Sequence, residues 1–461
     1  MSMGNRGEKQ RPMWVDAGGV SKGPGHPFYE ALNRLLREQG FDVFVAERCR
    51  PFYADGVGRP SLPPAVYFRL LLIGYFEGID SERGIAWRVA DSLGLREFLG
   101  YELSESTPDH STISRNRRRL PVEVHQEVFA WIVTVLGRKG LLRAKTLGVD
   151  ATTLEANAAL RSIVRRDSGE SYREFLLRLA QESGIETPTR EQLSRLDRKR
   201  KKKGSNQDWQ HPHDPDARIT KMKDGRTHLA HKAEHAVDLE TGAVIAVTLQ
   251  PADRGDTQSL EATLEEALEN LAVVAEDEEA SSQLSETPMA ELVADKGYHS
   301  GGVLKKVEQL GLRTYLPEPD RGRRCWKDRR DEQALTYANR RRVRGPRGRQ
   351  LLRLRGERLE RGFAHGYDTG GMRRTHLRGH GNILKRLLVH LGGLNLGLVL
   401  RQSLGAGTPR GLWGRLLGLS GLPDALLARL RNLWAGPSTL EVLLRPTPPF
   451  LITTEPHEAA A

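Results

Sequence analysis

Two short stretches, TLGVDATTLEANA at 146–158 and AELVADKGYHS at 290–300, decide the fold of this chain. In each, a run of about five strand-forming residues leads to an aspartate, Asp150 in the first and Asp295 in the second. Such a run predicts a buried strand that ends at the aspartate and delivers its carboxylate to the rim of a sheet, where hard cations and phosphates are held. The two stretches therefore indicate a cation site at the edge of a sheet.

The chain is also strongly basic, with a formal net charge of +12 over 461 residues and a pI near 9.7. From 321 to 361 there are 16 Lys and Arg residues, including the run RRRVRGPRGRQLLRLR at 340–355. This density exceeds that of an ordinary solvated face and predicts a polyanionic partner. Acids at strand ends in a basic protein are typical of a nuclease, in which carboxylates bind Mg²⁺ and the remaining surface attracts nucleic acid.

Several classes of protein are disfavoured by the composition. The two cysteines, Cys49 and Cys325, form no CxxC pair, so neither a disulfide framework nor a zinc module is expected, and a cytoplasmic setting fits. His211 and His213 lack a third ligand at fixed spacing and are expected on the surface. The first 14 residues lack an apolar signal core, and we expect neither export nor a membrane span.

The predicted elements divide the chain into four parts. Helical periodicity at 28–40, 63–78, 81–94 and 122–140 predicts an all-helical domain at 26–143, after a disordered N-terminus at 1–25. Strand patterns alternate with helices over 144–401, with an insertion at about 155–227 and a hairpin that turns at 239–242. A helical tail is expected at 402–461. The order of strands and helices in the third part is that of an α/β, RNase H-like mixed sheet flanked by helices.

Four motifs in one order carry a family resemblance. They are TPDHSTISRNRRRL at 107–120, VDATTLEANA at 149–158, VADKGYHS at 293–300, and ERGFAHGYDTGGMRRTHLRGHGNILKR at 360–386. The chain resembles the DDE transposases of bacterial insertion sequences, in which the first segment closes a helical N-terminal domain and the others carry the two aspartates and the glutamate. The resemblance runs in register from about residue 26 to residue 401.

The resemblance implies a recombinase that binds the terminal inverted repeats of its own element, cleaves there, and joins the freed 3′ ends to target DNA. By motif position, Asp150, Asp295 and Glu360 are the expected catalytic acids and the ligands of Mg²⁺, for which Mn²⁺ can substitute. The chain departs from a Tyr-x2-Arg-x3-Glu pattern found in many relatives, because Tyr337 and Arg340 are followed by Arg344. Glu360 is therefore placed by ERGFAH, with Glu357 as the alternative.

Cationic and phenolic side chains near these motifs are candidate DNA contacts. The alternatives are a solvated basic face for the arginines and turn packing for Tyr298. The candidates are Arg115, Arg117, Arg118, Arg119, Lys296, Tyr298, Arg340, Arg341, Arg342, Arg373, Arg374, Arg378 and Lys385.

Three functions are compatible with these patterns. The first is a DDE transposase that works on DNA in the cytoplasm, at the nucleoid, as a homodimer or a higher oligomer. The second is an RNase H-like nuclease or resolvase that cuts without joining, although it would not need the helical N-terminal domain or the long insertion. The third is a DNA-binding protein descended from an inactive transposase, which the presence of both Asp150 and Asp295 disfavours.

Overall fold

The computed structural model of the chain describes residues 25–54, 60–200, 204–222, 225–320, 322 and 324–420. The predicted disordered N-terminus and most of the predicted C-terminal tail lie outside these ranges. The chain divides into two compact units, residues 1–409 and 410–461. All the strands that the structure describes, and the candidate site, belong to the first unit.

The N-terminal part is helical, as the periodicity predicts. Ser81 caps the fourth helix by accepting a hydrogen bond from the Gly84 amide, and Asp109 caps the sixth through the amide of Thr112. The N-cap lies two and three residues before Ser111 and Thr112, because the Asp109 carboxylate accepts the free amide of Thr112. The helices are α1 (Pro27–Glu38), α2 (Phe41–Cys49), η1 (Arg50–Phe52), α3 (Pro64–Glu77), α4 (Glu82–Ala90), α5 (Leu93–Phe98), α6 (His110–Arg119) and α7 (Val122–Arg138).

A mixed six-stranded sheet forms the centre of the α/β part. Its strands are β1 (Thr146–Glu155), β4 (Arg218–Lys221), β5 (Thr227–Asp238), β6 (Val244–Pro251), β7 (Glu291–Val293) and β8 (Arg313–Tyr315). The order is β4-β5-β1-β7-β8, with β6 also paired to β5. β1 runs antiparallel to β5 and parallel to β7, and β8 runs parallel to β7. This mixed sheet confirms the predicted fold class.

The hairpin of β5 and β6 is confirmed, and Gly242 allows its turn by adopting a left-handed φ of 85°. The expected end of the first strand was wrong, because β1 continues to Glu155, five residues beyond Asp150. Its pairing with β5 runs to Glu155, whereas its pairing with β7 ends at Gly148. Asp150 therefore lies at the rim only on the side of β7.

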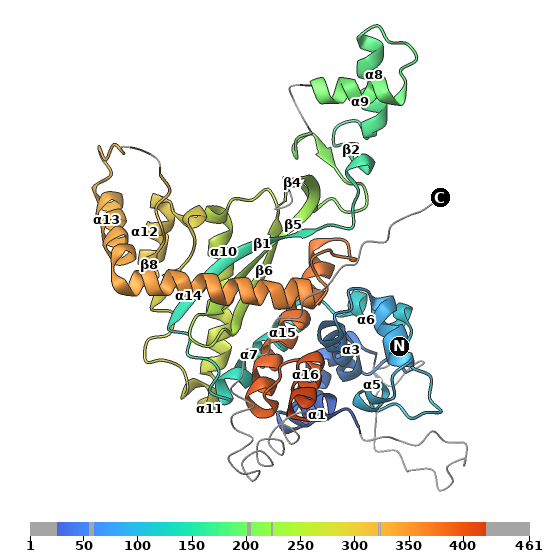
Figure 1. Cartoon of the computed structure of the whole chain (residues 1–461), viewed down its shortest axis with the longest axis vertical. Coiled ribbons are helices and arrows are strands. Elements are labelled where there is room, and N and C mark those ends of the chain that lie inside the picture. The colour runs from blue at the N-terminus through green and yellow to red at the C-terminus, as the bar shows by residue number, and fades with distance from the viewer. Residues whose placement is uncertain are drawn as a thin grey trace, which may run out of the picture. The chain divides into compact units, whose positions relative to one another are not determined.

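Helices cover both faces of the sheet (Figure 1). α10 (Asp256–Ala275) packs on β5 and β6, while α14 (Pro346–Phe363) crosses β1, β7 and β8. α14 continues into a π-helical segment, η4 (Ala364–Thr369), before α15 (His380–Leu404) packs against α3, α7 and β6. The remaining elements are α11 (Glu278–Ser281), η3 (Lys296–Tyr298), α12 (Gly301–Gln309), α13 (Arg330–Arg344) and α16 (Pro409–Ser420).

The predicted insertion has a small core of its own. Trp209 is 3% exposed and packs with Ala156, Ile163 and Leu229. His211 is also buried, so its expected surface position was wrong; the Trp209 cluster draws the adjoining loop inward. The elements here are η2 (Leu160–Ser162), β2 (Val164–Arg165), α8 (Tyr172–Glu182), α9 (Arg190–Lys199) and β3 (Trp209–Gln210).

One helical stretch, His380–Gly414, is long and apolar enough to cross a membrane by length and composition. Its most apolar window is 78% buried inside the structure. Leu387, Leu391 and Leu396 are fully buried. These observations fit the central helix of a protein core.

Candidate active site

The register of two parallel strands brings Asp150 and Asp295 together. Gly148 of β1 pairs with Val293 of β7, and each aspartate lies two residues further along its chain. Parallel strands present their carboxyl ends at the same edge, so the two carboxylates share one rim of the sheet. Burial raises the pKa of Asp150, the guanidinium of Arg355 opposes that rise, and the charge of Asp295 adds to it. The two side chains that the sequence predicted to form a site are therefore electrostatic neighbours.

Asp150 has an ion-pair partner on α14. The Arg355 guanidinium lies 2.6 Å from Oδ2 of Asp150, and the two side chains are 14% and 25% exposed. The other oxygen, Oδ1, accepts a hydrogen bond of 2.8 Å from the amide of Ala151. Arg355 also donates to the carbonyl oxygen of Val149, at 3.4 Å. α14 thus supplies the cation that balances the charge of Asp150.

A third carboxylate, Asp256, lies beside Asp295. A Cβ atom at Gly297 would collide with Oδ2 of Asp256 and lie only 2.9 Å from Oδ1 of Asp295. A side chain at Gly297 would require the Asp256 carboxylate to move. Lys232 of β5 holds Asp256 with a hydrogen bond of 2.6 Å from Nζ. Asp256 is the first residue of α10, directly after the N-cap Gly255.

Two hydrogen bonds, one within the turn and one to β5, hold the turn that follows Asp295. Oδ1 of Asp295 accepts the Gly297 amide at 2.7 Å, which closes the η3 turn. Tyr298 is 1% exposed, and its hydroxyl donates to the buried Glu234 at 2.8 Å. Lys296 is exposed. This turn therefore presents Lys296 to solvent and buries Tyr298, in keeping with turn packing for the phenol.

The two candidates for the third acid are neighbours on the exposed side of α14, and Glu360 lies closer to the buried face than Glu357. Leu351, Leu359 and Phe363 form the buried stripe of this helix. At 3.6 residues per turn, Glu357 falls about 180° from the centre of that stripe and Glu360 about 120° from it. Glu357 forms an ion pair of 3.0 Å with Arg361 on the outer surface.

Glu360 is exposed, one turn before Phe363. The Phe363 ring lies 5.0 Å from that of His235, which is the cross-strand partner of Asp150. Phe363 thus anchors this end of α14 over β1 and β5, close to the strand position that bears the first aspartate. Glu360 lies closer than Glu357 along α14 to this anchored end.

The chemistry of the rim fits a hard divalent cation. Asp150 and Asp295 supply carboxylate oxygens, the ligands that Mg²⁺ prefers. Within the part of the chain that the structure describes, no group of three or more His, Cys, Asp or Glu side chains is arranged to hold a metal ion. The fold therefore brings two of the three predicted ligands to one rim.

Some of the predicted DNA contacts keep their charge at the surface. Arg115 and Arg118 are exposed on α6, and Arg341 is exposed on α13. Arg374 and Arg378 are exposed in the segment between η4 and α15. These five side chains, with Lys296, present positive charge to solvent.

Other predicted contacts are engaged inside the protein. Arg117 is 7% exposed and pairs with Glu82 at 2.7 Å, while Lys385 donates to the Arg117 carbonyl oxygen. Arg342 donates to the backbone and side chain of Thr314. The remaining partners are Tyr53 for Arg119, Glu318 for Arg340, and Asp368 with Thr152 for Arg373. These side chains join elements of the fold.

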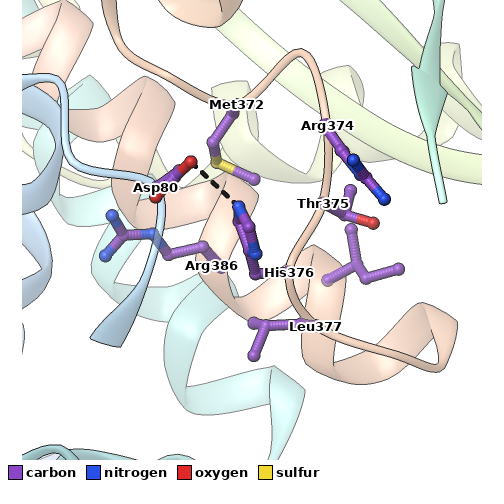
Figure 2. Close-up of a pocket in the computed structure, with 8 residues that line it drawn as sticks. Asp80, Met372, Arg374, Thr375, His376, Leu377 and Arg386 are labelled. Atoms are coloured by element: carbon purple, nitrogen blue, oxygen red, sulfur yellow. Dashed lines mark hydrogen bonds and ion pairs between the residues drawn. The ribbon is translucent and has the colours of Figure 1, made fainter. Parts of the chain in front are cut away.

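A small pocket lies where the segment after η4 meets the loop between α3 and α4. His376 and Asp80 point toward one another across it, 2.9 Å apart, as Figure 2 shows. The buried Arg386 donates to the carbonyl oxygens of Leu71 and Ile79. These contacts fix the segment that carries Arg374 against the N-terminal helices.

Comparisons with known proteins give two matches to family models. Residues 21–119 match a model described as a transposase domain (DUF772). Residues 184–396 match a model described as a transposase DDE domain, which includes Asp295 and Glu360. Asp150 lies between the two matched segments. No curated protein and no solved structure matches the chain.

Proposed function

Because this chain belongs to the DDE-type transposases of insertion sequences, we propose that it binds the terminal inverted repeats of its element and catalyses Mg²⁺-dependent DNA cleavage and strand transfer. The single observation that best supports this reaction is the register of β1 and β7, which brings Asp150 and Asp295 to one rim. A pair of carboxylates at this rim suits in-line displacement at phosphorus, which needs a divalent cation close to the reacting oxygens.

Each side chain of the site has a distinct role in this proposal. Asp150 and Asp295 hold the cation, and Glu360 completes the ligand set when α14 or the bound DNA adjusts. A divalent cation held by these carboxylates would supply the positive charge that activates the attacking oxygen and stabilises the leaving oxygen of the phosphodiester. Lys296, exposed one residue after Asp295, contacts a phosphate next to the scissile bond.

The DNA-binding surface is best assigned to the cations that remain exposed. Arg115 and Arg118 of α6 contact the DNA backbone, and Arg341, Arg374 and Arg378 contact phosphates nearer the active site. Arg117, Arg342 and Lys385 have a structural role in this assignment, because intramolecular partners hold their charges. The enzyme acts in the cytoplasm, at the nucleoid, as a homodimer or a higher oligomer on DNA.

The decisive experiment is an in vitro joining assay with purified protein, Mg²⁺, and DNA that carries the inverted repeats flanking the gene. We expect cleavage at the repeat end and joining of the 3′ end to target DNA. Asp150→Asn and Asp295→Asn abolish both steps while keeping specific end binding, because a carboxamide lacks the charge that holds Mg²⁺.

Two other results would assign a different function. Cleavage without joining would indicate a nuclease, and end binding without cleavage would indicate an inactive descendant. Strand transfer by either asparagine variant at the normal rate would reject the two aspartates as the metal site.

A further inference from the structure

Both carboxylate oxygens of Asp150 are already in use. Oδ1 accepts the Ala151 amide, and Oδ2 lies 2.6 Å from the guanidinium of Arg355. Mg²⁺ binds carboxylate oxygens at about 2.0 to 2.1 Å in near-ideal octahedral geometry. A dication bound to Oδ2 and a guanidinium held on the same oxygen repel each other, so each weakens the binding of the other to Asp150.

The surroundings of Arg355 make this exchange possible. Its side chain is 14% exposed, so the guanidinium lies at the edge of the solvent. Its other contact, with the Val149 carbonyl oxygen, is long at 3.4 Å. Arg355 also lies on the helix that carries Glu360, five residues earlier. A movement that releases Arg355 from Asp150 therefore takes place on the element that is proposed to bring the third acid.

The neighbouring acids explain why a cation is needed here in the absence of metal. Asp295 and Asp256 both add negative charge close to Asp150. Lys232 compensates Asp256, at 2.6 Å. Arg355 does the same for Asp150, so each of these two acids has a basic partner that balances it within the protein.

We propose that Arg355 is an internal counter-ion that occupies Asp150 in the metal-free enzyme and is displaced when a divalent cation binds. The proposal rests on the proposed function, since it takes Asp150 as a metal ligand. Arg355 is in this view a positioning residue that competes with the metal. A guanidinium that only held Asp150 in place would instead assist metal binding.

Mn²⁺ binding to the full-length protein, measured by titration calorimetry without DNA, separates the two roles. We expect Arg355→Gln to bind Mn²⁺ about tenfold more tightly than the wild type, the factor expected for losing one partly exposed charged competitor. Arg355→Lys keeps the charge and should stay close to the wild type. Arg353→Gln removes an exposed charge from the same helix and is the matched control.

Weaker or unchanged Mn²⁺ binding by folded Arg355→Gln, or an equal gain in Arg353→Gln, would overturn the proposal. If Arg355→Gln does not fold, the lysine variant decides, because competition predicts retained affinity and a required bidentate geometry predicts its loss. Addition of Asp150→Asn to Arg355→Gln should remove the gain.

If Mn²⁺ binding by the wild type does not depend on Asp150, the proposed metal site fails and this inference fails with it. If binding depends on Asp150 but Arg355→Gln weakens it, only this inference fails.

Discussion

The hydroxyl of Tyr298 donates a hydrogen bond of 2.8 Å to Oε1 of Glu234. Glu234 is fully buried in β5 and also accepts hydrogen bonds of 2.6 Å from Ser259 and Thr263 of α10. These hydrogen bonds join the turn that bears Asp295 to strand β5 and helix α10. The sequence suggested Tyr298 as a DNA contact, but its buried hydroxyl instead holds this turn against the sheet.

Tyr298→Phe tests this role. Loss of the hydroxyl leaves Glu234 with two of its partners and should lower the free energy of unfolding by about 1 to 3 kcal/mol. DNA affinity should not change, because the ring is buried. Urea denaturation and a DNA-binding titration on the same preparation check both expectations. A large loss of DNA affinity at unchanged stability would restore the phosphate-contact role.

Glu360→Gln and Glu357→Gln form a matched pair on one helix. We expect Glu360→Gln to abolish Mg²⁺-dependent cleavage of end-containing DNA. Glu357→Gln breaks only the exposed pair with Arg361 and should cost about 0 to 1 kcal/mol of stability with cleavage retained. Single-turnover cleavage assays of the two variants check this. The opposite pattern would move the third acid by one helical turn.

Arg341→Gln and Arg342→Gln compare an exposed cation with an engaged one on α13. Each phosphate contact that is lost should reduce the slope of log K against log salt by roughly 0.9. Arg341→Gln should therefore flatten the slope by about that amount. Arg342→Gln should leave the slope unchanged and lower the melting temperature, because Arg342 donates to Thr314. DNA-binding isotherms at several salt concentrations measure both slopes. An unchanged slope for Arg341→Gln would mean that Arg341 contacts solvent and no phosphate.

Three buried histidines predict instability in acid. Burial lowers the pKa values of His125, His235 and His390 to about 3, whereas the ordinary value is 6.5. Between these values the unfolded chain binds protons that the folded chain does not, so stability that is complete above pH 6.5 is lost as the pH falls toward 3. Urea midpoints from pH 7 to about pH 4 should fall steadily. His235→Gln should reduce the steepness, and a flat profile for the wild type would contradict the prediction.

Local patterns accounted for most elements of the fold. The helices at α3 and α7 and the hairpin of β5 and β6 follow from apolar periodicity and turn residues, which act over a few neighbouring positions. The C-terminal end of β1 could not be predicted from local periodicity and turn residues. DATTLE continues as a strand because β5 offers it a partner as far as Glu155, and a partner strand is not visible in the local sequence.

The sequence by itself determined the α/β fold class, the helical N-terminal part, and the choice of Asp150 and Asp295 as candidate acids, because each depends on short-range periodicity and motif order. Only the tertiary structure decided which charges face one another. It placed Arg355 on Asp150 and Asp256 beside Asp295, and it buried Tyr298. The reason is physical: an ion pair or a buried hydrogen bond depends on distance in space, and chain folding brings together residues that no spacing in the sequence relates.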